Sequence, residues 1–107
     1  MIGWKQAYNL RRTCIVLVKL EIPDTEKIVR VRKFGLTQNF YRCSRARVLD
    51  ITTLDGGQRG RVAVSLRDPD FRYEVGKEVY ALRDPFIGRH PGIHFFASKD
   101  EALKYEY

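Results

Sequence analysis

The sequence is poor in the residues that build metal centres and disulfide frameworks, with two cysteines and two histidines among 107 residues. Cys14 and Cys43 lie far apart, and neither histidine belongs to a cluster with metal-ligand spacing. We therefore expect no metal site and no cofactor. Since the chain shows no signal peptide, two such separated cysteines favour a reducing, cytoplasmic location.

Long apolar runs are also absent. The most apolar stretch begins at Cys14 and is interrupted at Lys19, whereas a membrane helix needs roughly 20 apolar residues. There is no repeat, low-complexity tract or linker. These absences predict a single domain over residues 1–107 that does not contact a membrane.

What the chain has in excess is positive charge. Twenty Lys and Arg against 13 Asp and Glu give a formal net charge of +7, and 13 of the 20 are arginine. Arginine pairs bidentately with phosphate and stacks on bases, so the excess suits a nucleic acid, a nucleotide or an acidic protein surface. Solubility alone is the simpler alternative.

Short runs of β-branched and alternating residues predict strands separated by turns. The expected strands are a central one over 13–22, a half-exposed one over 27–33, and others over 61–66, 71–75 and 92–96. Residues 42–54 fit either a short helical turn or a strand, and we favour a turn followed by a strand through 48–54. Three glycines in 54–60 predict a hairpin loop between 48–54 and 61–66. A strand follows that loop, where a phosphate loop needs a helix. Residues 84–92 predict an irregular surface connection.

The end of the chain predicts a capped helix. Ser98 and Glu101 form the Ser-x-x-Glu capping pattern, and Ala102 with Leu103 or Tyr105 would face a sheet. The expected fold is α+β, a mainly antiparallel β-sheet with a C-terminal α-helix packed on it. A small sheet with spare edges often pairs, so we also expect a homo-oligomer.

Several short motifs occur in a recognisable order. They are Gly3-Trp4-Lys5, Val18-Lys19-Leu20-Glu21-Ile22-Pro23, Ala46-x-Val48-Leu49, Phe71-x-Tyr73-x-Val75-Gly76-Lys77, and Gly92-Ile93-His94-Phe95-Phe96 followed by Glu101-Ala102-x-x-Tyr105. Together they resemble an uncharacterised domain at the C-terminus of many pentapeptide-repeat proteins of viruses and bacteria, here in a stand-alone version. The resemblance implies the fold and a phage setting, hence a host cytoplasm, but no activity.

Two departures concern the cysteines of that family. It usually has Lys-Cys-Arg-Ala where this chain has Phe40-Tyr41-Arg42-Cys43, and often a cysteine where this chain has Arg89-His90-Pro91. The resemblance therefore implies no role for Cys14 or Cys43.

The densest chemical signal is Tyr41-Arg42-x-Ser44-Arg45-x-Arg47. Guanidinium groups can hold a phosphate while a ring stacks on a base; a solvated charged face is the alternative. His94 and Phe96 share one face of a strand, where His94 either packs or meets a ligand. The predicted ligand-binding residues are Tyr41, Arg42, Arg45, Arg47, Arg72, His94 and Phe96.

Three functions remain open. The first is non-catalytic binding or sequestration of a small phosphorylated or nucleotide-like ligand, as by a phage-borne antagonist of host nucleotide signalling. The second is a protein-interaction module with an Arg-rich surface. The third is a degenerate ADP-ribosyltransferase-like enzyme, for which no catalytic residues are identified. Extended nucleic acid fits less well, because acids such as Asp50, Asp55 and Asp68 interrupt the basic residues. We favour the first, non-enzymatic function.

Overall fold

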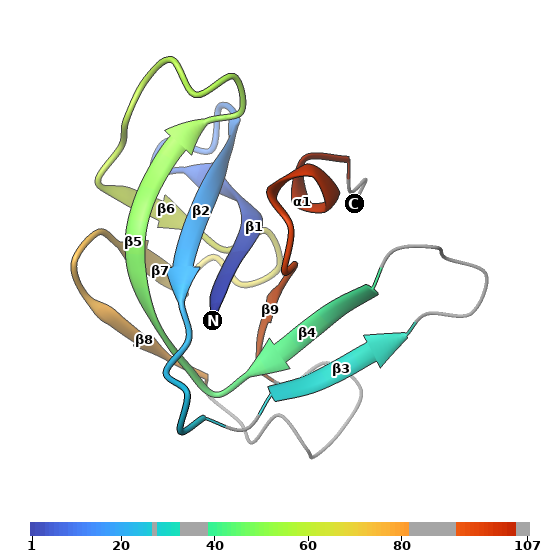
Figure 1. Ribbon diagram of the computed structural model, residues 1–107. Helices are drawn as coiled ribbons and strands as arrows, with labels where there is room; N and C mark the ends of the chain where they lie inside the picture. Colours follow the sequence, from blue (N-terminus) through green and yellow to red (C-terminus); the bar gives the residue numbers. More distant parts are fainter. Residues whose placement is uncertain (27, 33–38, 82–91, 105–107) are drawn as a thin grey trace.

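A computed structural model describes residues 1–26, 28–32, 39–81 and 92–104 (Figure 1). The elements within these residues are β1 (Ile2–Asn9), β2 (Ile15–Glu21), β3 (Ile28–Arg32), β4 (Asn39–Cys43), β5 (Arg45–Thr53), β6 (Val62–Val64), β7 (Arg72–Glu74), β8 (Glu78–Tyr80), β9 (Ile93–Phe95) and α1 (Lys99–Lys104). The pairings between the strands are antiparallel, so the predicted antiparallel sheet with a C-terminal helix is confirmed in outline.

The larger sheet has the strand order β7-β6-β1-β2-β5-β8, and Figure 1 shows that it is curved. Its two outer strands, β7 and β8, follow each other in the chain and are joined by the turn at Val75–Lys77. That turn bonds to both halves of the sheet: Val75 donates to the carbonyl of Arg61 and Gly76 to that of Val48. Gly76 has a φ of +85°, which glycine adopts without steric cost. The two edges are thereby drawn toward each other around one interior.

The smaller sheet, β3-β4-β9, is joined to the larger one at β1. Trp4 and Phe96 exchange two backbone hydrogen bonds of 2.8 and 2.7 Å, so the end of β9 lies beside β1. Gly3 makes this approach possible, because a Cβ there would lie 2.3 Å from Cδ2 of Phe95. In Figure 1 the small sheet lies below the helix, and β4 leads directly into the start of β5.

Alternation along the strands divides the buried residues between two apolar clusters. The main core lies inside the curl and holds Ala7, Val16, Val18, Leu20, Ile22, Cys43, Ala46, Val48, Ile51, Ala63, Tyr73, Val79, Ile93 and Phe95. The second cluster lies under α1, where Leu17, Phe96 and Ala102 are buried and Trp4 and Leu103 pack on them. The helix therefore covers the outer face of β1 and β2.

The predicted helix cap is confirmed. The amide of Glu101 donates to Oγ of Ser98 at 3.5 Å, and Ala102 donates to the Ser98 carbonyl at 3.2 Å. Of the residues expected to face the sheet, Ala102 is fully buried and Leu103 is half buried. Tyr105 and most of the irregular connection at 84–92 lie outside the described residues.

The predicted hairpin between 48–54 and 61–66 is wrong. Arg59 does form a bridge back to Thr52, but β6 then pairs with β1 and β7. The edge of β5 that does not pair with β2 is occupied by this bridge and by β8. Strand β6 therefore pairs with the edge of β1 that β2 leaves open. Residues 42 and 43, predicted as the start of a turn, belong to β4. Residues 3–5 of β1 stand out in the sequence as a motif, but no strand is predicted there.

Candidate functional site

Arg42 and His94 lie directly opposite each other on β4 and β9. Their neighbours Cys43, Ile93 and Phe95 are buried in the main core, so alternation directs Arg42 and His94 to the other face of the small sheet. Both side chains are half buried, and Nε of Arg42 and Nε2 of His94 are almost fully removed from solvent. A guanidinium with several donors thus lies beside an imidazole in a partly desolvated place.

Apolar side chains border this pair. Val29 is the cross-strand partner of Arg42 on β3, and it is half buried. Phe96 lies two residues after His94 and is buried beneath α1 with Leu17 and Ala102. Phe96 therefore contributes packing at the margin of the pair, and its ring belongs to the cluster under the helix.

Tyr41 faces the opposite way. Its ring stacks on that of Phe95, with centroids 5.7 Å apart and an angle of 22° between the planes. It packs against the main core, next to the Cys43 side of β4. The predicted stacking residue is thus separated by the sheet from Arg42 and His94.

Arg45 is held by an acid from a distant part of the chain. Its Nε lies 3.2 Å from Oε1 of Glu26, and Oγ of Ser44 donates to the other oxygen of the same carboxylate. The Glu26 and Arg45 side chains are mostly buried. This arrangement fixes the bend between β4 and β5. Arg45, predicted to bind a ligand, pairs with Glu26 instead.

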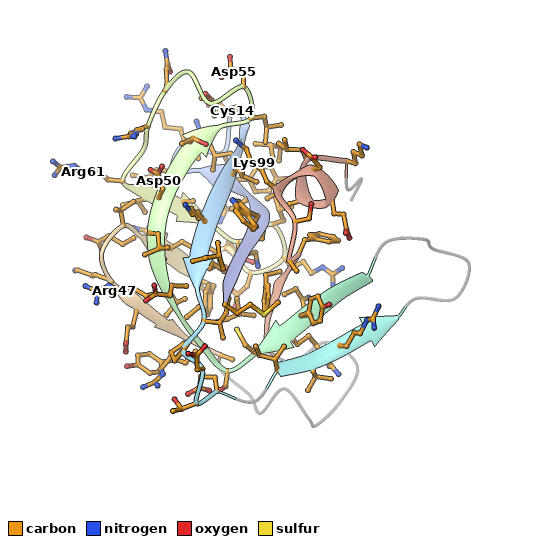
Figure 2. All side chains as sticks on the ribbon, viewed as in Figure 1. Cys14, Arg47, Asp50, Asp55, Arg61 and Lys99 are labelled. Atoms are coloured by element: carbon orange, nitrogen blue, oxygen red, sulfur yellow. The ribbon has the colours of Figure 1, made fainter. Side chains whose placement is uncertain are left out.

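Arg47 and Arg72 lie elsewhere on the large sheet. Arg47 is exposed on β5 (Figure 2). It has two acidic cross-strand partners, Glu21 on β2 and Glu78 on β8. Opposite charges in such positions attract each other. Arg72 is exposed on β7, at an outer strand of the sheet. The fold therefore does not bring the seven predicted residues together at one site. Of the seven, Arg42 and His94 lie opposite each other on neighbouring strands.

A polar group inside the main core was missed by the sequence reasoning. Lys5 on β1 is only 8% exposed, and its Nζ lies over the ring of Tyr73, 5.0 Å from the centroid. Burial is the main cause that lowers the Lys5 pKa to about 8; Cys43 opposes this effect and Arg67 adds to it. Within the described residues no acid forms an ion pair with Lys5. Recognising β1 as a strand would have placed Lys5 on the same face as Gly3 and Ala7, which are buried.

Cys43 lies in the same interior. Burial raises the pKa of its thiol to about 11, although a hydrogen bond from the Arg45 backbone and the charge of Lys5 both lower it, and Glu26 raises it further. Cys14 is exposed and directly precedes β2. In the part of the chain that is described, no three His, Cys, Asp or Glu side chains gather as they would around a metal ion. Nor does the helix there have the length and apolar character to span a bilayer.

Searches of curated proteins and of solved structures found nothing similar. A family model described as a family of unknown function (DUF5758) matches residues 1–102, nearly the whole chain. The match covers β1 to β9 and most of α1. The chain therefore belongs to this family of unknown function, DUF5758.

Proposed function

We propose that this protein binds a small phosphorylated or nucleotide-like ligand without converting it, and that Arg42 and His94 contact the phosphate. The observation that supports this most is their direct opposition on β4 and β9. Both residues supply nitrogen donors, and Arg42 adds a positive charge. A half-buried position strengthens their attraction for an anion, because the local dielectric is lower than that of water.

The apolar border fits the rest of such a ligand. Val29, the half-buried cross-strand partner of Arg42, offers apolar surface for a base or a ribose. Arg45 is already paired with Glu26, and Arg47 lies between Glu21 and Glu78. The proposed site is for this reason smaller than the predicted set of seven residues. Sequestration of a host signalling nucleotide by a phage protein remains the biological setting that we propose, on the sequence resemblance alone.

The test is a thermal-shift screen with inorganic phosphate, linear nucleotides and cyclic nucleotides, followed by titration of the compounds that stabilise the protein. Arg42→Lys keeps the charge but loses the bidentate fork, and His94→Gln keeps a nitrogen donor but removes the imidazole. Each variant is expected to weaken binding about tenfold or more, equal to about 1.4 kcal/mol. Arg72→Ala, which removes an exposed arginine elsewhere, is the matched control and should bind as the parent does.

Chromatography of the ligand recovered after denaturation separates the remaining functions. Recovery of the intact compound supports binding or sequestration, and recovery of an altered one supports an enzyme. If no compound shifts the melting temperature, or if Arg72→Ala weakens binding as much as Arg42→Lys does, the proposed site is wrong.

A further inference from the structure

One end of the large sheet is formed by two loops that carry leucines and arginines. They are the β1–β2 turn, residues 10–14, and the β5–β6 loop, residues 54–61. Val16 on β2 is the cross-strand partner of Thr53 on β5, so both loops leave the sheet at the same end. Figure 2 shows Cys14 of the first loop and Asp55 of the second near each other there. We call this surface the Leu-Arg end.

Large apolar side chains are exposed on both loops. Leu10 is 52% exposed and Leu54 is 39% exposed. A single exposed leucine on a protein surface is ordinary. Two on neighbouring loops, at an end that also concentrates charge, are the pattern of a binding surface with an apolar centre.

Three exposed arginines lie in these loops at that end: Arg11, Arg12 and Arg59. Arg61, the last residue of the second loop, projects to the side in Figure 2, away from Cys14 and Asp55. None of these guanidinium groups forms an ion pair or a side-chain hydrogen bond with any described residue. The one acid in these loops, Asp55, accepts hydrogen bonds from Oγ1 of Thr53 at 2.5 Å and from the Gly57 amide at 2.9 Å. The Leu-Arg end therefore carries a net charge of +2 (three arginines, one aspartate). This contrasts with Arg45 and Arg47, which have acidic neighbours.

Internal hydrogen bonds hold both loops in place. In the first, Oδ1 of Asn9 accepts from the amides of Thr13 and Cys14 at 2.7 and 3.2 Å. In the second, the amide of Thr53 donates to the Gln58 carbonyl at 2.9 Å and that of Gly60 to the Ile51 carbonyl at 2.8 Å. Side chains on ordered loops lose less conformational entropy on binding than those on mobile loops.

We propose that the Leu-Arg end binds an acidic segment of a partner protein in which apolar side chains alternate with carboxylates. The arginines supply charge complementarity, and the leucines accept the apolar side chains. Single-stranded nucleic acid is the less suitable occupant, because its bases stack on aromatic rings and the exposed apolar side chains of these loops are leucines. This binding is independent of Arg42 and His94, which lie on the small sheet.

The test uses fluorescence anisotropy with three labelled probes of equal net charge. They are a peptide of alternating glutamate and leucine, the same peptide with serine for leucine, and an oligothymidylate. The Glu-Leu peptide is expected to bind about tenfold or more tightly than the other two, and its affinity should fall as salt is added. Equal or tighter binding of the oligothymidylate would overturn the proposal in favour of nucleic acid.

Two double variants separate the contributions. Arg11→Ala with Arg12→Ala should weaken the two peptides alike, whereas Leu10→Ser with Leu54→Ser should bring the Glu-Leu peptide to the affinity of the Glu-Ser peptide. Lys19→Ala with Lys77→Ala removes two exposed positive charges elsewhere and is the control. All these positions are exposed, so folding should persist, and circular dichroism checks it. If the control lowers affinity as much as the arginine pair does, only net charge attracts the peptide and the site is excluded.

Discussion

Nε2 of Gln6 on β1 donates a hydrogen bond of 2.8 Å to the carbonyl of Ala102 on α1, 96 residues away in the chain. A longer contact of 3.4 Å joins the same nitrogen to the carbonyl of Leu103. Carbonyls in the last turn of a helix have no partner within the helix. Gln6 satisfies them from the strand beneath, and so it fixes α1 on the outer face of the large sheet.

Gln6→Leu should therefore destabilise the protein by about 1–3 kcal/mol, because it leaves a buried carbonyl without its donor. Gln6→Glu should cost more, since a carboxylate cannot donate and repels the negative end of the helix dipole. Urea unfolding measures both. If Gln6→Leu unfolds at the same urea concentration as the parent, the hydrogen bond does not hold the helix.

Gly3→Ala tests the approach of β9 to β1. The new Cβ would lie 2.3 Å from Cδ2 of Phe95, whose ring is buried and stacked on Tyr41, so the strands must separate or the ring must move. We expect a loss of about 1–3 kcal/mol in the free energy of unfolding. Gly60→Ala is the control, because its Cβ would lie 3.5 Å from Ile51 in ordinary contact. Phe95→Leu should relieve part of the Gly3→Ala loss, and additivity of the two changes would argue against the clash.

Glu26→Gln tests the acid at the bend between β4 and β5. It removes the charge that pairs with Arg45 and weakens the hydrogen bond from Ser44, in a place where both partners are mostly buried. We expect a loss of about 1–3 kcal/mol. Glu74→Gln is the matched comparison, since the Lys77–Glu74 pair is exposed and such pairs contribute between about 0 and 1 kcal/mol. Equal effects of the two changes on chemical denaturation would contradict this account.

We expect Lys5 to contribute to the pH dependence of the free energy of unfolding. Burial lowers its pKa from 10.5 to about 8 in the folded protein. Between these values the unfolded chain keeps the Lys5 proton that the folded protein has lost, so this group makes stability rise with pH. Lys5→Met should be more stable than the parent at neutral pH, by up to about 3 kcal/mol, and the difference should shrink from pH 8 upward. A constant difference from pH 7 to pH 10 would contradict a titrating Lys5.

The Cys43 thiol should lower the free energy of unfolding as the pH rises above about 9. Burial raises its thiol pKa from 9.0 to about 11, so the unfolded chain releases this proton first and stability falls between these values. The two contributions together predict a rise from about pH 8 to 9, little change to about pH 10.5, and then a decline. Cys43→Ala should extend the rise beyond pH 9, as measured by thermal melting across this range. A parent and variant with parallel profiles above pH 9 would show that the thiol does not contribute.

Local signals were enough to predict several elements. The β-branched run before Pro23 predicted a central strand and appears as β2, flanked by β1 and β5. The Ser98 capping pattern predicted α1, whose first turn depends on neighbouring residues only. The hairpin prediction failed because strand pairing depends on which edges are free elsewhere in the sheet. Glycines mark a reversal, but they do not say which strand will be the partner of β6.

For the candidate site, the sequence determined which chemistry is present: an excess of arginine, one histidine within an apolar strand, and two cysteines far apart. Only the tertiary structure decided which charges are already balanced. Glu26 meets Arg45 from 19 residues away in the sequence (45 minus 26), and Glu21 and Glu78 flank Arg47 from either side. Such pairings arise from the register of strands that the chain brings together, whereas composition and periodicity describe each strand alone. The opposition of Arg42 and His94 and the burial of Lys5 have the same origin.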